Sequence, residues 1–198
     1  MGADIGVKKI NMAKKVKGLA GFLKDFPPRY NLYFDGNNLI DEPIIDGQEH
    51  DIFLRIMSEP ISRIFSGKKK FELRKYVPKH SGLVFLYEGD KVQAVSGCFY
   101  FKNFIAKPKN ELWKIVGENA TTKDKFDAYF NEKEFGVALE IIDFQKFDTP
   151  ITSEELYRSF PNFPSTPQPY VYLYSNKNNE FSQFLRSKAS DIISRIEI

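Results

Sequence analysis

The chain has 198 residues, of which 42% are hydrophobic, 28% charged and 15% aromatic. This length can bury one hydrophobic core, and so many aromatic side chains exclude a disordered chain and favour β-structure. No apolar run approaches the roughly 20 residues of a membrane helix, and the single cysteine, Cys98, excludes an internal disulfide. We therefore expect a cytoplasmic protein with no membrane partner.

The net charge of +3 is unevenly distributed along the chain. Residues 1–25 hold six lysines and two aspartates, which leaves the rest of the chain near neutral, at −1. Residues 7–26 place apolar residues three and four apart with lysines between them, and this predicts a basic amphipathic helix. Such helices most often pack on their own domain, but some lie on nucleic acid, on a membrane or against a protein partner. Residues 29–50 are rich in turn residues and predict an irregular extension.

From residue 51 onward, short strand patterns and short helix patterns follow one another. Gly97 interrupts one strand pattern, where a β-bulge or a closely approaching ligand is expected. Ser153, which two glutamates follow, is the expected cap of one helix. This order indicates an α+β protein with a mixed β-barrel and small inserted helices. We predict strands at 52–57, 70–74, 82–87, 92–104, 135–147 and 170–174, and helices at 61–65, 110–116, 123–130, 153–160 and 178–195.

The stretch at 63–79 is locally basic, with seven lysines and arginines and a single acid. Alternate side chains of a strand share a face, so within 70–74 the three charged residues point one way while Phe71 and Leu73 enter a core. Gly67 is expected to end the preceding helix and to turn the chain into this strand. A basic surface of this kind suits contacts to phosphate groups. The alternative is a solvated edge strand whose lysines oppose aggregation.

Four residues of this stretch, Gly67, Lys69, Glu72 and Arg74, fit the pattern G-x-K-x-x-E-x-R. The chain around them resembles the ASCH (activating signal cointegrator homology) domain, a branch of the PUA-like β-barrels. The resemblance covers 51–175 and is strongest to the prokaryotic and phage proteins described as predicted transcriptional regulators with a PUA-like domain. The further landmarks that carry it are Glu59-Pro60 before the pattern and Tyr87, Gly97, Leu112-Trp113, Tyr129-Phe130 and Pro167-Gln168-Pro169-Tyr170 after it.

The resemblance implies a PUA-like mixed β-barrel at 51–175. The residue patterns outside it predict a basic helix and irregular extension at 1–50 and a C-terminal helical extension at 176–198. The resemblance also implies a cleft beside the motif that binds RNA or a modified nucleotide, with gene regulation as the suggested role.

In such a cleft, cationic side chains bind phosphate through charge-assisted hydrogen bonds. Glu72 would accept from a base amine or orient a neighbouring arginine. Tyr76 and Tyr87 would stack on bases, and Trp113 and Tyr170 are further stacking candidates whose alternative is core packing. The predicted nucleic-acid-binding residues are Lys68, Lys69, Lys70, Glu72, Arg74, Lys75, Tyr76 and Tyr87.

Two other functions stay open at this point. In an enzyme, Lys69 would act as the base and Glu72 would move a proton or position water. Some proteins similar to ASCH domains are amidohydrolases that act on acetylated cytidine with a lysine, a threonine and a glutamate, and at least one is a ribonuclease. Lys69 matches that lysine, but Glu72 stands where the threonine belongs, which argues against amidohydrolysis. The other alternative is a protein-interaction module whose N-terminal helix docks a partner.

Metal and cofactor chemistry find no support in the sequence. The two histidines, His50 and His80, are thirty residues apart and form no metal-ligand spacing with Cys98. There is also no phosphate-binding lysine loop and no dinucleotide fingerprint. We therefore expect no metal and no cofactor.

Overall fold

The computed structural model describes residues 51–75, 78, 81–161, 171–173 and 179–196, together with the backbone of two short paired strands, β1 (Phe34–Asp35) and β2 (Asn38–Leu39). The predicted N-terminal helix lies outside the described residues, as do Tyr76 and Tyr170. No helix in the described part of the chain is long and apolar enough to cross a membrane.

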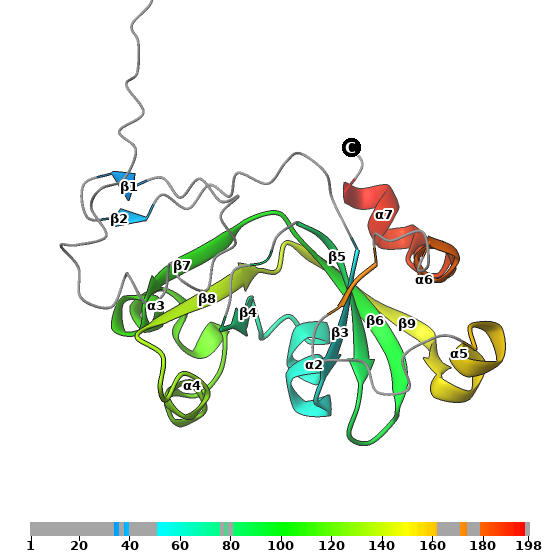
Figure 1. Cartoon of the computed structure of the whole chain (residues 1–198), viewed down its shortest axis with the longest axis horizontal. Coiled ribbons are helices and arrows are strands. Elements are labelled where there is room, and N and C mark those ends of the chain that lie inside the picture. The colour runs from blue at the N-terminus through cyan, green and yellow to red at the C-terminus, as the bar shows by residue number, and fades with distance from the viewer. Residues whose placement is uncertain are drawn as a thin grey trace, which may run out of the picture.

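The other described strands form two sheets (Figure 1). They are β3 (Ile52–Ile56), β4 (Phe71–Arg74), β5 (Gly82–Glu88), β6 (Ala94–Phe101), β7 (Phe104–Pro108), β8 (Phe135–Glu140), β9 (Asp143–Thr152) and β10 (Val171–Tyr172). The five-stranded sheet has the order β10-β3-β5-β6-β9, in which β3 and β5 are parallel and the other neighbours antiparallel. The three-stranded sheet has the order β4-β8-β7 and is antiparallel.

Two long predicted strands each bend from one sheet into the other. The run predicted at 92–104 contains β6 and, after residues 102–103, only the first residue of β7, which continues to 108. The run predicted at 135–147 is divided by residues 141–142 into β8 and the first half of β9, which continues to 152. The sequence predicts the extended conformation of both runs, whereas their bends depend on tertiary packing. The α+β class is confirmed, but the described strands form two separate sheets and do not close into one ring.

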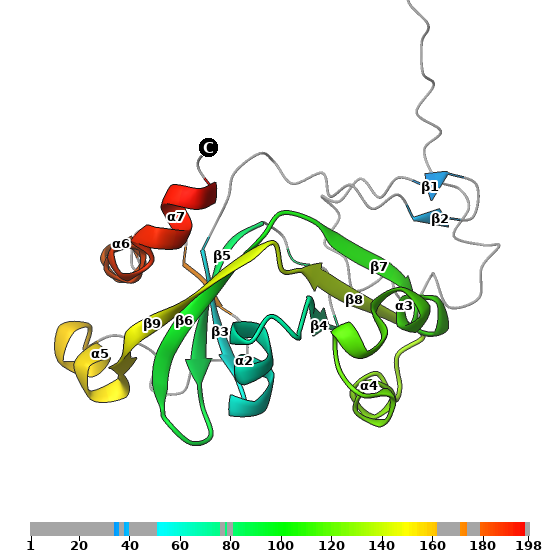
Figure 2. The same ribbon diagram turned by 180° about the vertical axis from the view of Figure 1, so that it is seen from behind.

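The described part of the chain also contains six α-helices and one 3₁₀ turn. In Figures 1 and 2, α3 and α4 lie at one end beside the three-stranded sheet, α5, α6 and α7 lie at the other end, and α2 lies between them. The helices are α2 (Ser58–Phe65), α3 (Lys109–Val116), α4 (Lys123–Tyr129), α5 (Ser153–Ser159), α6 (Asn179–Lys188) and α7 (Ser190–Ile196), and the 3₁₀ turn is η2 (Gly117–Asn119).

Two helix predictions need correction. The helix predicted at 178–195 is divided in two at Ala189, which separates α6 from α7. The cap of α5 is Thr152, whose hydroxyl oxygen accepts from the Glu155 N–H at 3.2 Å. Ser153, the predicted cap, instead donates its hydroxyl to the Gln93 carbonyl at 2.7 Å.

Strand β5 is buried on both faces, and its alternate side chains enter two different cores. Leu83, Phe85 and Tyr87 join a core with residues of α5, α6 and α7. Val84 and Leu86 join a second core, which contains residues of both sheets and of α2. A third core lies between the three-stranded sheet and the helices α3 and α4. The C-terminal helices therefore share a core with the five-stranded sheet.

Gly97 lies at the bulge that its position in the strand pattern predicts. The pairing of β6 with β9 shifts register between Val95 and Gly97. A Cβ atom on Gly97 would stand 2.2 Å from the Gln145 carbonyl oxygen and 2.6 Å from the Phe65 ring. The close approach at this glycine is therefore to the protein's own backbone and core.

Cys98 is fully buried in β6, as predicted, and its burial gives a prediction about alkaline pH. Burial, with a smaller contribution from the negative charge of Asp51, raises the pKa of the Cys98 thiol from its ordinary 9.0 to about 12. The thiol is therefore still protonated in the folded chain at pH values where the unfolded chain has lost that proton. Its contribution to stability is complete below pH 9.0 and is lost as the pH rises towards 12.

We expect wild-type protein to lose about 1 kcal/mol more stability than Cys98→Ala between pH 9 and pH 10, because the thiol of the unfolded chain goes from half ionised to almost fully ionised over this range. Urea unfolding of both proteins at pH 7, 9 and 10 measures this difference, and the pH 7 pair removes the cost of the small cavity. Parallel pH profiles of the two proteins would contradict it.

Candidate functional site

The turn after α2 has the geometry predicted for Gly67. Gly67 adopts a φ of 69°, a conformation that side chains disfavour. The Gly67 N–H donates to the Ile64 carbonyl at 2.8 Å, and the Lys68 N–H donates to the Arg63 carbonyl at 2.9 Å. This paired arrangement is a Schellman motif, which ends the helix and directs the chain into β4.

Strand β4 divides its side chains between two faces, as the alternation predicts. Phe71 and Leu73 pack in the core that α3 and α4 cover. Glu72 and Arg74 lie on the other face, where an Arg74 terminal nitrogen stands 2.6 Å from Glu72 Oε1. Lys70 differs from the prediction, since its exposed side chain does not join this pair.

Lys69, Glu72 and Arg74 form an ionic cluster in which Lys69 and Glu72 are buried and Arg74 is partly buried. Lys69 Nζ lies 3.3 Å from Glu72 Oε2, and the two residues are only 6% and 5% exposed. Tyr129 lies beside the cluster; burial raises the pKa of its hydroxyl, and the positive charge of Arg74 partly offsets that rise. Lys75 places its ammonium group 5.1 Å from the centre of the Tyr129 ring. Lys69 and Glu72 thus lie inside the protein, and Arg74 is partly exposed beside them.

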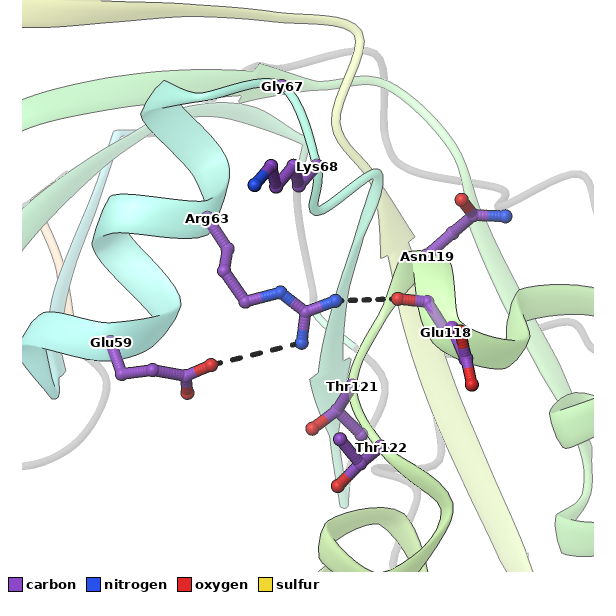
Figure 3. A pocket seen from close by; sticks show the side chains of 8 residues that line it. All are labelled: Glu59, Arg63, Gly67, Lys68, Glu118, Asn119, Thr121 and Thr122. Atoms are coloured by element: carbon purple, nitrogen blue, oxygen red, sulfur yellow. Dashed lines mark hydrogen bonds and ion pairs between the residues drawn. The ribbon is translucent and has the colours of Figure 1, made fainter.

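A hollow of about 620 Å³ lies beside this cluster, between α2 and the segment 117–122 (Figure 3). Arg63 reaches from α2 across the hollow, where it donates to the Glu118 carbonyl at 2.6 Å and lies 3.9 Å from the Glu59 carboxylate. The lining contains two cations and two carboxylates, so it is balanced in formal charge. The lining residues are Glu59, Arg63, Gly67, Lys68, Glu118, Asn119, Thr121 and Thr122.

Two exposed lysines stand at this hollow. Lys68 is part of its lining, and the ammonium nitrogen of Lys70 lies 3.9 Å from the position that a Cβ on Gly67 would occupy. Neither lysine forms an ion pair with another described residue. Hydroxyl, amide and carboxylate groups line the wall opposite Lys68.

The predicted binding residues separate into groups in the structure. Lys68 lines the hollow, and the Lys70 ammonium group stands beside Gly67, which also lines it, whereas Lys69, Glu72 and Arg74 are not among the lining residues. Lys69 and Glu72, the residues proposed for the enzyme alternative, are not among the residues that line the hollow.

The two predicted stacking residues that the structure describes, Tyr87 and Trp113, do not line the hollow. Tyr87 points into the core on the other face of the five-stranded sheet, where its hydroxyl lies 2.7 Å from Ser153 Oγ. Trp113 packs on Phe126 with ring centres 5.1 Å apart, and Lys123 stands 5.5 Å from the Trp113 ring. The structure thus shows the core packing that was the alternative for Trp113.

Sequence reasoning missed the wall formed by the segment 117–122 and missed Arg63 as a lining residue. In the sequence, Arg63 is only one of the seven lysines and arginines of the basic stretch at 63–79. A polar run between two predicted helices, which contains Glu118, Asn119, Thr121 and Thr122, is the signal that points to the wall. No feature of the neighbouring sequence indicates that this run lies against α2, which is more than 50 residues earlier in the chain.

Comparison with known proteins identifies the fold. No protein-family model matches the sequence, and no curated protein matches it. The crystal structure of ASCH from Zymomonas mobilis matches with a TM-score of 0.59 and 24% identity, over 67% of this chain and 94% of that chain. Crystal structures of two mutants of the same protein match with TM-scores of 0.59 and 0.58, each at 24% identity, over 67% and 68% of this chain and 96% and 95% of theirs.

The architecture is thus that of an α+β protein with short helices and two sheets, between which the chain passes from β6 to β7 and from β8 to β9. More specifically, it is the fold of an ASCH domain, as the resemblance in the sequence predicts. At this level of identity the likeness establishes the fold alone.

Proposed function

We propose that the protein binds single-stranded RNA or a nucleotide in the hollow between α2 and the segment 117–122. The observation that carries this proposal is the pair of exposed lysines, Lys68 and Lys70, which stand without ionic partners among the described residues beside a hollow of about 620 Å³. Ammonium groups held in this way attract phosphate and lose little by exchanging water for it.

The opposite wall supplies the groups that contact bases and sugars. The hydroxyls of Thr121 and Thr122 and the amide of Asn119 both donate and accept, and Glu118 accepts from an amine. A lining balanced between cations and carboxylates favours a ligand that combines phosphate with hydrogen-bonding base edges over a bare polyphosphate. The ASCH resemblance implies a ligand of the same class.

Two finer statements belong to the same proposal. We infer that the two sheets are parts of a PUA-like barrel at 51–175, because β6 continues into β7 and β8 into β9 around one shared core. A role in gene regulation would follow from RNA binding of this kind.

A double variant tests the proposed function. Lys68→Ala with Lys70→Ala should weaken binding of a fluorescent single-stranded RNA and reduce the slope of log K against log salt by about 1.4, since each phosphate contact on a single strand contributes about 0.7. Titrations at several salt concentrations measure both quantities.

The matched control is Lys91→Ala with Lys102→Ala, which removes two exposed lysines that do not line the hollow. This control should keep the wild-type affinity and slope. The proposal is wrong if wild-type protein binds no RNA or nucleotide at low salt, or if the two double variants lose affinity equally.

A further inference from the structure

Three successive carbonyl groups of the 117–122 segment are bound by one short stretch of chain. The Glu118 carbonyl accepts from the Arg63 side chain at 2.6 Å, the Asn119 carbonyl from the Lys70 N–H at 2.7 Å, and the Ala120 carbonyl from Lys69 Nζ at 2.8 Å. All three donors come from residues 63–70, which form the end of α2 and the turn after it. The segment 117–122, which forms one wall of the hollow, is thus held in place by residues 63–70 on the other side.

Lys69 is fully engaged in this arrangement. Its ammonium group is buried, donates to the Ala120 carbonyl and pairs with Glu72, which Arg74 holds from its other side. A buried ammonium group that left these partners for a ligand would leave the Glu72 carboxylate and the Ala120 carbonyl with fewer partners in the protein interior. The position of Lys69 therefore suits fixing the wall and does not suit contacting a ligand.

We infer that Lys69 is a positioning residue, which holds the segment 118–122 in the shape that receives the ligand, with Glu72 and Arg74 fixing Lys69 in turn. The part concerning the ligand rests on the proposed function, whereas the part concerning the wall does not. The inference assigns different roles to adjacent lysines: Lys68 contacts the ligand, and Lys69 supports the surface that the ligand meets.

The two roles leave different signatures in binding experiments. A lysine that contacts phosphate contributes to the salt dependence of binding, because the contact releases counterions. A positioning lysine changes affinity without changing that dependence. Its loss should also loosen the wall, whose Ala120 and Thr121 amides both donate to the Gly117 carbonyl.

The experiment compares Lys69→Met, which keeps the side-chain length but removes the charge and the donor, with Lys68→Ala. We expect Lys69→Met to weaken binding of single-stranded RNA about tenfold with an unchanged salt slope, and to speed hydrogen exchange at Ala120 and Thr121 about tenfold. Lys68→Ala should reduce the slope by about 0.7 and leave exchange at those amides unchanged.

A measurement on wild-type protein covers the case in which Lys69→Met does not fold. An acetylating reagent should modify Lys68 and Lys70 in the free protein and spare Lys69, and RNA should protect the first two. The inference is overturned if Lys69 is acetylated as fast as Lys68 and gains protection from RNA, or if Lys69→Met reduces the salt slope while exchange stays at the wild-type rate. If wild-type protein binds no RNA, the proposed function fails, and the exchange and acetylation rates of the free protein still decide whether Lys69 holds the wall.

Discussion

Replacing Glu72 with alanine should destabilise the folded protein by about 3–5 kcal/mol, because it leaves buried cations without their counter-charge. Glu72 is 5% exposed and stands between Lys69 at 3.3 Å and Arg74 at 2.6 Å. The buried Oε2 atom of Glu72 and two buried nitrogens of Arg74 form no hydrogen bond with another described residue, so among these residues they depend on ionic attraction. Urea unfolding at neutral pH measures the loss.

Glu154→Ala is the matched control for this variant. Glu154 also pairs with an arginine, Arg158, at 2.7 Å, but the two side chains are 81% and 76% exposed. Exposed pairs of this kind contribute about 0.2–1 kcal/mol, so this variant should unfold almost as wild-type protein does. Equal losses in Glu72→Ala and Glu154→Ala would show that burial of the cluster has no energetic consequence.

Gly97→Ala should cost about 3 kcal/mol, because the added methyl group would overlap atoms that cannot move independently. Its nearest neighbour, at 2.2 Å, would be the Gln145 carbonyl oxygen in β9, and the Phe65 ring at the end of α2 would follow at 2.6 Å. To make room, β9 or α2 must shift away from β6. Thermal and urea unfolding both report this loss.

Gly89→Ala is the matched control for Gly97→Ala, because its added methyl group would meet a flexible side chain and not a backbone atom. A Cβ on Gly89 would approach Arg55 Nε to 2.3 Å, but Arg55 is an exposed side chain that can rotate away. We expect this variant to lose less than about 1 kcal/mol. If Gly97→Ala is equally mild, the pairing of β6 with β9 is looser than the close approach at Gly97 indicates.

The features that the sequence predicts well are those with local causes. The turn at Gly67 follows from a glycine after a short helical pattern, and the two faces of β4 follow from alternation over four residues. The bends at 102–103 and 141–142 have no such cause, because each depends on a neighbouring strand that bends at the same place. The run predicted at 135–147 proved to be β8 and the first half of β9, and the run predicted at 92–104 covers β6 and only the first residue of β7.

Lys69 shows the limit of the sequence at the candidate site. Within a run of three lysines it looks like another exposed cation, yet it is buried while Lys68 and Lys70 are exposed. Its burial is possible because the Ala120 carbonyl, 51 residues later, accepts a hydrogen bond from its ammonium group and Glu72 forms an ion pair with it. The motif lies beside the candidate hollow, but only tertiary structure separates the residues that line the hollow from those behind them.

The most direct test of the binding site is a titration of isotope-labelled protein with a short single-stranded RNA and with mononucleotides, followed by amide NMR shifts. Our account predicts the largest shifts at Gly67, Lys68 and residues 118–122, which face each other across the hollow. Shifts gathered around Tyr87 and α5, or no shifts with either ligand at low salt, would contradict it.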